Sequence, residues 1–219
     1  MNCRLCQQHC LTNMVFCERQ LSDALTSLPV DERKLETPKY HVLDGGSWIH
    51  RLPWKKGATF EEIVKTYVQY VKSFTNPTVV FDGYTSSSTK YITHLRRSKG
   101  VVGPTVILKG NMTLRTKRDI FLSNSVNKQN FIDSLCEKLE HDDVKTLKAS
   151  GDADLLIAQT GVNRAQSGST HVIGEDTDLL VLRLHHAKPK MHNLVFRSDK
   201  HTKLDKKSKV SCWNINLIR

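Results

Sequence analysis

From about residue 40 onwards the chain alternates between short apolar runs and longer amphipathic segments. The apolar runs have lengths typical of buried strands and stand at residues 40–44, 78–81, 143–150, 170–174 and 192–198. The amphipathic segments predict helices over residues 59–74, 127–142, 155–165 and 176–186. Strands that alternate with helices indicate a three-layer α/β fold, in which a parallel sheet carries helices on both faces.

Some of these elements carry recognisable start and stop signals. Thr59 and Glu62, three residues apart, form a capping box at the start of the first predicted helix. The serines at 86–88 can begin a further helix that ends at Gly100. Residues 101–126 show no readable pattern, and no element is predicted there.

The order of the elements places one domain between two less regular segments. Residues 1–39 lack sustained periodicity and include a polar connector with two prolines. Residues 40–198 hold the predicted strands and helices and form the expected domain. We interpret residues 199–219 as a basic C-terminal segment, with a truncated end as one interpretation.

The net charge of the chain indicates which class of binding partner it favours. Its 33 Lys and Arg residues exceed its 22 Asp and Glu residues, and the net charge of +11 favours a polyanion such as nucleic acid. The alternative is a basic, soluble surface. The sequence has no apolar run of about 18 residues, and its first residues include Cys, Gln and Arg where a signal peptide needs an apolar centre. We therefore expect an intracellular protein, nuclear or cytoplasmic, without a membrane partner.

A cluster of three cysteines and one histidine near the N-terminus has ligand types that bind zinc. The residues concerned are Cys3, Cys6, His9 and Cys10. Zinc needs about four thiolates or imidazoles in a tetrahedron, and the spacing here is cramped. The alternative, which the spacing favours, is a set of reduced thiols.

Carboxylates recur where the predicted strands end. They are Asp44, Asp82, Asp152, Asp154, Asp176 and Asp178. The carboxyl ends of parallel strands meet at one edge of a sheet, which is where α/β folds place their functional crevice. Several carboxylates at one edge repel one another unless a cation lies among them, and Mg²⁺ and Mn²⁺ prefer such oxygen ligands. A cluster of this kind can hold two ions for phosphodiester cleavage.

Helix capping is the alternative interpretation of each of these residues, because an Asp before a helix often serves as its N-cap. Asp44 and Asp82 are each followed by Gly and are expected to close a strand without opening a helix at once. In addition, one cap cannot explain both members of an Asp-x-Asp pair. The recurrence therefore favours a metal site.

The four motifs resemble, in order, those of the PIN-domain superfamily, in particular its flap-endonuclease-like branch. They are "VLDGGSWIHRL" at Asp44, "VVFDGY" at Asp82, "GDADLLIA" at Asp152 and Asp154, and "GEDTDLLVL" at Asp176 and Asp178. The resemblance covers residues 40–198. Within the superfamily, the motifs look most like those of a group of uncharacterised animal PIN-like proteins often linked to transposon-like genes. The resemblance implies a carboxylate-bound metal site and a nucleic-acid substrate.

The resemblance also extends to a predicted basic helix, whereas two acidic positions depart from the pattern of the family. Lys90 and Arg97 have the seven-residue spacing with which the family steers the scissile phosphate, and the alternative is a solvated basic face. The chain has Asp152 and Asp154 where the family usually has glutamates. No clear equivalent of the family's last acidic residue follows Asp178.

The sequence therefore predicts a Mg²⁺- or Mn²⁺-dependent nuclease that acts on DNA or RNA. One rival is a degenerate module of the same fold that binds nucleic acid or protein without cleavage. The other is a metal-dependent phosphatase, since Asp-x-Asp also occurs there. That chemistry expects Thr or Val two residues after the second Asp, whereas Leu180 follows Asp178.

Overall fold

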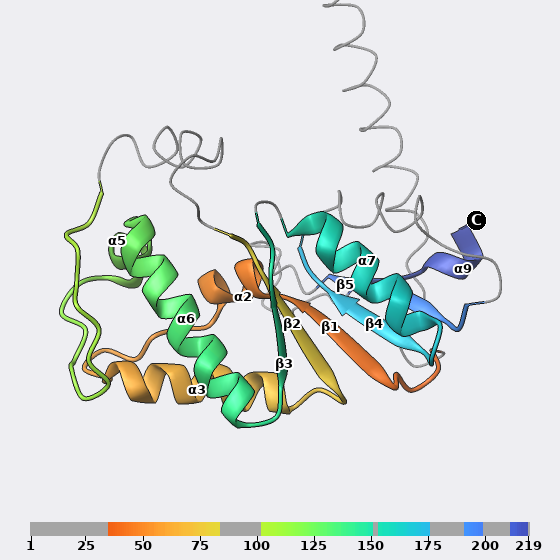
Figure 1. The fold of residues 1–219 in the computed structure, drawn as a ribbon, viewed down its shortest axis with the longest axis horizontal. Coiled ribbons are helices and arrows are strands. Elements are labelled where there is room, and N and C mark those ends of the chain that lie inside the picture. Colours follow the sequence, from red (N-terminus) through yellow and green to blue (C-terminus); the bar gives the residue numbers. More distant parts are fainter. Residues whose placement is uncertain (1–34, 84–101, 151–152, 176–190, 199–210, 219) are drawn as a thin grey trace, which may run out of the picture.

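The computed structural model describes residues 35–83, 102–150, 153–175, 191–198 and 211–218. Within these ranges one six-stranded sheet contains β1 (Tyr40–Asp44), β2 (Pro77–Phe81), β3 (Lys145–Lys148), β4 (Thr170–Ile173), β5 (Leu194–Ser198) and β6 (Ser211–Asn214) (Figure 1). The order across the sheet is β3-β2-β1-β4-β5-β6. Neighbouring strands are parallel, except that β6 runs antiparallel to β5. The predicted α/β fold with a parallel sheet is confirmed.

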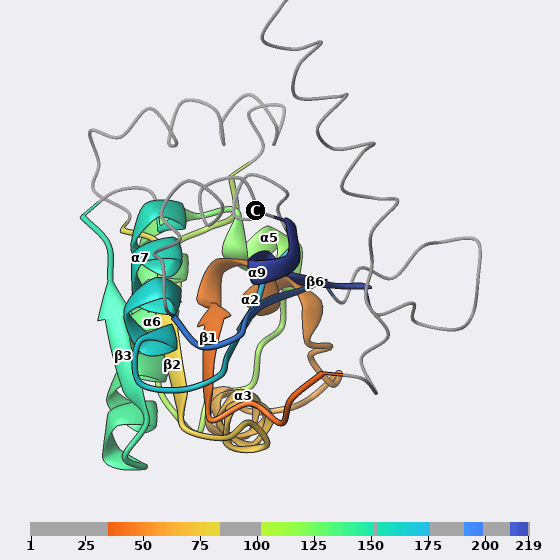
Figure 2. The same ribbon diagram turned by 90° about the vertical axis from the view of Figure 1, so that its right-hand side faces the viewer.

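Helices cover both faces of the sheet (Figures 1 and 2). The helices whose side chains share one core cluster are α2 (Gly45–Arg51), α3 (Phe60–Lys72), α5 (Arg118–Leu122) and α6 (Ser125–His141). Helix α7 (Asp154–Ala165) packs with a second cluster, and the short α9 (Ile215–Ile218) contributes to the same cluster. Because side chains alternate along a strand, Leu43 of β1 enters the first cluster and Val42 the second.

The first cluster joins α2 to α3 through aromatic side chains. The rings of Trp48 and Tyr67 lie 4.9 Å apart between centroids. The hydroxyl of Tyr67 donates a hydrogen bond to the carbonyl of Ile49 at 2.6 Å and accepts one from Trp54 Nε1 at 2.9 Å. These bonds fix the loop between the two helices. The predicted capping box at Thr59 is also present at the start of α3.

Several parts of the described chain differ from the sequence interpretation or go beyond it. One is α5, which lies within residues 101–126, where no element was predicted. Helix α2 begins directly after β1, where a loop was expected. Residues 102–117, which had no readable pattern, run along α3 and α6. Two buried asparagines hold them there: Asn124 donates to the carbonyl of Gly103 at 2.9 Å, and Asn127 accepts from the amide of Val106 at 2.7 Å. Strand β6 extends the sheet beyond residue 198.

The strand order creates a point where the chain changes direction. It moves outwards from β1 to β2 and β3, then returns to β4 on the other side of β1. In open α/β sheets the functional crevice lies at the carboxyl ends of the strands at such a switch point. In this chain those ends are Asp44 of β1 and Gly174, which follows β4. Within the described ranges, no helix is both long and apolar enough to cross a lipid bilayer.

Candidate active site

Asp44 ends β1 and is also the N-cap of α2. Its Oδ1 accepts hydrogen bonds from the amides of Gly46 at 2.9 Å and Ser47 at 3.2 Å. The expectation that Asp44 closes a strand without opening a helix is therefore wrong. The reason is that Gly45 and Gly46, which are poor helix formers, occupy the first two helical positions. Capping fixes the orientation of the carboxylate and leaves it at the carboxyl edge of the sheet.

Asp82 directly follows β2, the parallel neighbour of β1, and lies beside Asp44. A methyl group built on Gly46 would lie 3.1 Å from Asp82 Oδ2 and 3.3 Å from Asp44 Oδ1. The two carboxylates therefore flank the same glycine. Asp82 Oδ1 accepts a hydrogen bond from the amide of Ala153 at 3.0 Å. One oxygen of each carboxylate is thus anchored to the backbone.

The pair is electrostatically unfavourable when both groups are charged. Burial is the largest cause that raises the pKa of Asp44, and the negative charge of Asp82 raises it further. Hydrogen bonds from the amides of Ser47 and Gly46 act in the opposite direction. A cation beside the two carboxylates would offset both the burial and the repulsion.

The glycine of each Asp-Gly pair allows a close approach of two elements. A methyl group on Gly45 would lie 2.4 Å from Cδ1 of Phe81, a buried residue of β2. A methyl group on Gly83 would lie 2.2 Å from the carbonyl oxygen of Ala149, just after β3. From the sequence alone, these glycines are expected only to mark the ends of strands. In the structure they hold the segments around the two carboxylates together.

Asp154 is the first residue of α7 and is half-buried. The hydrogen bond from Ala153 to Asp82 brings the first turn of α7 to Asp82. The structure therefore brings the segments that carry Asp44, Asp82 and Asp154 to one edge of the sheet. Outside the described residues lie the remaining predicted site residues, Asp152, Asp176, Asp178, Lys90 and Arg97, and the thiol cluster of Cys3, Cys6, His9 and Cys10. Among the described residues alone, no group of three His, Cys, Asp or Glu side chains could hold a metal ion.

An ion pair beside the switch point was not expected from the sequence. Arg51, the last residue of α2, donates from Nε to Glu175 Oε1 at 3.0 Å, and its Nη2 contacts the same oxygen. Glu175 follows the carboxyl end of β4. Its 124-residue separation from Arg51 leaves no local signal by which sequence analysis could find the pair.

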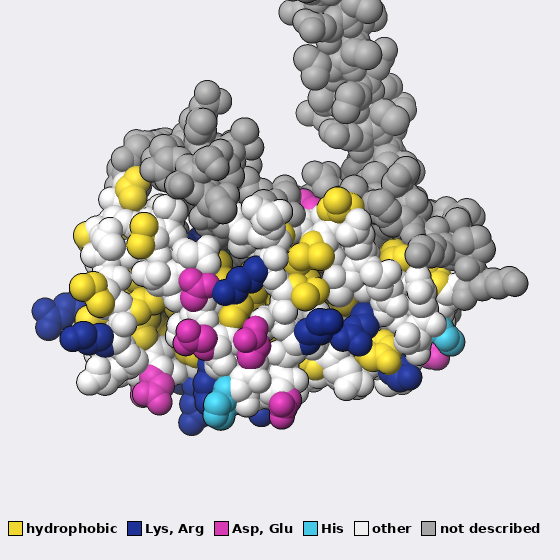
Figure 3. Space-filling view, viewed as in Figure 1, with side chains coloured by type: hydrophobic (Ala, Val, Ile, Leu, Met, Phe, Trp, Pro, Cys, Tyr) yellow, Lys and Arg dark blue, Asp and Glu magenta, His cyan; other side chains and the backbone are white. Residues whose placement is uncertain are grey.

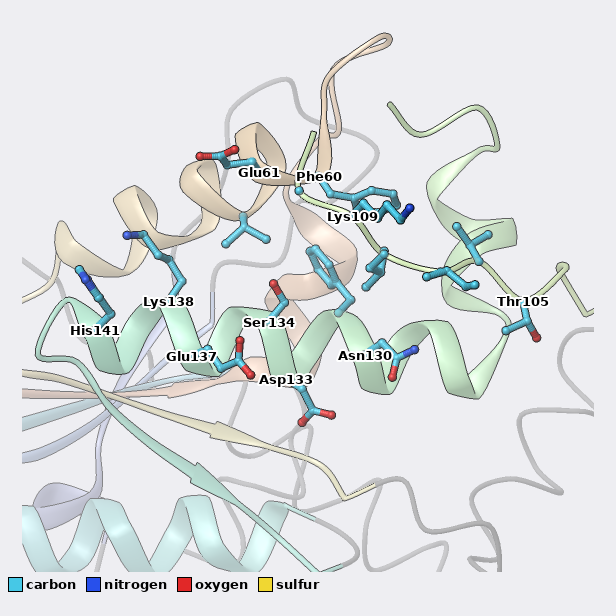
Figure 4. Close-up of a pocket in the computed structure, with 16 residues that line it drawn as sticks. Phe60, Glu61, Thr105, Lys109, Asn130, Asp133, Ser134, Glu137, Lys138 and His141 are labelled. Atoms are coloured by element: carbon cyan, nitrogen blue, oxygen red, sulfur yellow. The ribbon is translucent and has the colours of Figure 1, made fainter. Parts of the chain in front are cut away.

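A separate groove of about 680 Å³ lies between α3, α6 and the extended segment 105–110 (Figure 4). Apolar side chains such as Phe60 and Phe131 line it beside polar ones such as Glu61 and Lys138. Of the predicted site residues that the structure describes, Asp44, Asp82 and Asp154 do not line this groove. It is therefore distinct from the carboxylate edge.

Charges of both signs share the face shown in Figure 3. Lys and Arg side chains are interspersed there with Asp and Glu side chains over the described residues. One ion pair among the described residues joins Lys148 of β3 to Asp133 of α6 at 2.6 Å. The net charge of +11 is therefore not gathered into a basic surface on the described part of this face.

No family model and no curated protein matches the chain, but solved structures do. One is the catalytic core of Rad2 in complex with a DNA substrate, with 16% identity, a TM-score of 0.45, and coverage of 88% of this chain and 52% of that one. Another is the Holliday junction-resolving enzyme GEN1 in complex with product DNA and a Mg²⁺ ion, with 13% identity and a TM-score of 0.42. The match covers 83% of this chain and 34% of the GEN1 chain. This chain thus spans about half of the Rad2 core and about a third of GEN1. The likeness concerns the fold alone.

Proposed function

We propose that the chain is a Mg²⁺- or Mn²⁺-dependent nuclease that cleaves phosphodiester bonds in DNA or RNA. The observation that carries the proposal is the juxtaposition of Asp44 and Asp82 around Gly46. The two carboxylates follow adjacent parallel strands, next to the switch point of the sheet. Carboxylates of this kind fit a hard divalent cation, which prefers oxygen ligands.

Each residue of the pair has a definite part in this proposal. Asp44 and Asp82 would hold the cation, and their bonds to the amides of Gly46 and Ala153 keep the carboxylates oriented. A bound ion would supply an activated water and stabilise the leaving oxygen. Asp44 gains from the cation, because burial and the charge of Asp82 disfavour its ionised form.

The proposal extends to the other predicted site residues. Asp152, Asp154, Asp176 and Asp178 would complete a site for two ions, and Lys90 and Arg97 would position the scissile phosphate. Their sequence positions after strands support this assignment, as does the placement of the first turn of α7 beside Asp82. The net charge of +11 supports a polyanionic substrate.

The test is cleavage of labelled single-stranded, duplex and flapped DNA and RNA, with Mg²⁺, with Mn²⁺ and with EDTA. Asp82→Asn should lower metal-dependent cleavage by more than about 100-fold, the upper end for residues that only support a ligand. Asp142→Asn is the matched control, because it removes a carboxylate that pairs with Lys72 next to the amino ends of β2 and β3, at the opposite edge of the sheet. Cleavage that survives Asp82→Asn, or that EDTA does not affect, would refute the proposal.

The rival function is binding of nucleic acid without cleavage. The observation that favours it is that the sequence shows no clear equivalent, after Asp178, of the last acidic residue of the family that it resembles. A pure binding module would bind equally well in EDTA and in Mg²⁺, with an affinity that falls steeply with salt. Fluorescence anisotropy with the same labelled substrates separates the two functions, since only the nuclease shortens them.

A further inference from the structure

The ion pair between Arg51 and Glu175 joins two segments that meet at the switch point. Arg51 is the last residue of α2, the helix that Asp44 caps, and Glu175 is the second residue after β4. Both Nε and Nη2 of Arg51 contact the same oxygen, Oε1. The guanidinium therefore holds the carboxylate through two nitrogens rather than through one flexible contact.

The two partners differ in how they face the solvent. The side chain of Arg51 is 16% exposed, whereas that of Glu175 is 40% exposed. The arginine is thus largely packed within the fold, and the glutamate is drawn towards it from the edge of the sheet. Exposed ion pairs contribute little to stability. A packed arginine can nevertheless hold its partner residue, here Glu175, in a fixed position at the edge of the sheet.

The backbone on either side of Glu175 shows what the pair orients. The amide of Gly174 donates to the carbonyl of Arg197 at 3.2 Å, which continues the pairing of β4 with β5 for one residue beyond the strand. Glu175 is the next residue, and Asp176 follows it in the sequence. The ion pair therefore acts at the position where the chain leaves the sheet.

The charge of Glu175 is also accounted for by this contact. Asp44 and Asp82 already repel each other at the same edge of the sheet. Arg51 offsets the negative charge of Glu175 through their direct contact. The pair can thus orient the exit of β4 without opposing the ionisation of Asp44.

We propose that Arg51 and Glu175 are positioning residues for the carboxylate site: the pair ties the end of α2, the helix that Asp44 caps, to the carboxyl end of β4, so that the acidic edge can bind a divalent cation. This inference rests on the proposed function, because it takes the carboxylate edge as a metal site. Neither residue contacts the ion itself. Both act through α2, whose first turn is capped by Asp44 and whose last residue is Arg51.

The experiment measures Mn²⁺ binding to the purified full chain by electron paramagnetic resonance of free Mn²⁺, without nucleic acid. Arg51→Met should weaken Mn²⁺ binding about tenfold, within the range for residues that orient metal ligands. Arg51→Lys, which keeps the charge but not the two-nitrogen contact, should fall between Arg51→Met and the unmodified protein. Glu175→Gln removes the charge at nearly constant shape and should resemble Arg51→Met.

A matched control separates positioning from a general loss of an ion pair. Lys72 of α3 and Asp142 form a long-range ion pair at 3.1 Å, next to the amino ends of β2 and β3 and thus at the opposite edge of the sheet. Lys72→Met should leave Mn²⁺ binding unchanged. Thermal unfolding of every variant checks that the binding data come from folded protein. In cleavage assays, Arg51→Met should raise the Mn²⁺ concentration for half-maximal rate and leave KM for the nucleic acid unchanged.

The possible outcomes distinguish this inference from the proposed function. Equal Mn²⁺ affinities for the unmodified protein, Arg51→Met and Glu175→Gln, with binding still lost in Asp82→Asn, would overturn the inference and keep the metal site. Absence of Mn²⁺ binding in the unmodified protein would overturn the metal site and the inference with it. If Arg51→Met does not fold, Glu175→Gln decides the question alone.

Discussion

Gly45 and Gly46 are adjacent in sequence, yet the structure predicts opposite consequences for replacing each with alanine. Both lie in the first turn of α2 with backbone conformations open to alanine, since the described glycine with a positive φ is Gly57. Alanine favours a helix over glycine by about 0.5–1 kcal/mol. The difference between the two sites therefore comes from the space around the added methyl group.

At Gly45 the methyl group would lie 2.4 Å from Phe81 Cδ1 and 2.9 Å from the carbonyl oxygen of Val80. Carbon atoms in contact normally stay about 3.5–4.0 Å apart, so the ring or the strand must move by about 1 Å. Phe81 is fully buried and β2 is an inner strand, and neither can move cheaply. Such overpacking costs about 1–3 kcal/mol. Gly45→Ala should therefore lose about 1–2 kcal/mol of unfolding free energy after the helix gain is subtracted.

At Gly46 the nearest atoms are the carboxylate oxygens of Asp82 at 3.1 Å and Asp44 at 3.3 Å. A shift of a few tenths of an ångström accommodates the methyl group, and the helix gain offsets the cost. Gly46→Ala should stay within about 1 kcal/mol of the unmodified protein. It should nevertheless weaken divalent-metal binding, because an apolar group then stands between the two carboxylates.

The assay is urea unfolding of both variants in EDTA, followed by Mn²⁺ titration of each folded protein. For a domain of this size, 1 kcal/mol shifts the urea midpoint by roughly 0.5 M. The expected result is a lowered midpoint for Gly45→Ala and a nearly unchanged midpoint with weakened Mn²⁺ binding for Gly46→Ala. A Gly45→Ala protein with an unchanged midpoint would refute the close packing of α2 on β2. A Gly46→Ala protein with full Mn²⁺ affinity would refute the carboxylate pair as the metal site.

Two further predictions concern pH. Asp44→Asn keeps a good N-cap and removes a carboxylate whose pKa is raised, so that its ionisation destabilises the folded state above its ordinary pKa of 3.8. Without metal, this variant should be at least as stable as the unmodified protein to urea at pH 7, and the difference should shrink as the pH falls through the raised pKa of Asp44 and be largely gone below 3.8; a less stable variant at pH 7 would contradict the reasoning. Burial, then His41 and Arg197, lower the pKa of His171 from 6.5 to about 4. The unfolding free energy should therefore fall as pH drops from 6.5 towards 4, and in urea titrations His171→Leu should flatten this dependence; an unchanged slope would show that His171 does not cause it.

The elements that the sequence predicts correctly are those with local signals. The capping box of Thr59 and the apolar face of α3 belong to a single segment, and the runs that become β1 and β2 are long enough to recognise. Helix α2 was missed because its glycines oppose a helix, while its stability comes from the Asp44 cap and from burial of Trp48. Strand β6 was missed because its four residues depend on pairing with β5.

The same distinction applies to the candidate site. The rule that parallel strands end at one edge predicts that Asp44 and Asp82 lie together, and the structure places them on either side of Gly46. No such rule predicts the ion pair of Arg51 with Glu175, because the pair depends on the order of strands across the sheet. The role of Gly45 could not be predicted either, since the sequence does not show that this glycine packs against the ring of Phe81.

The central position of β1 also has a consequence for the newly made chain. Strand β2 is synthesised soon after β1, so the carboxylate pair can form early. The partner on the other side comes much later: Lys39, just before β1, hydrogen-bonds to Ser169, 130 positions further along. At a translation rate of about 5–20 residues per second, β1 waits roughly ten seconds for β4. During that time one edge of β1 is unpaired and Val42 lacks the helix that later covers it. Until β4 and α7 have been made, the emerging polypeptide therefore exposes an unpaired strand edge, which is a feature that promotes aggregation.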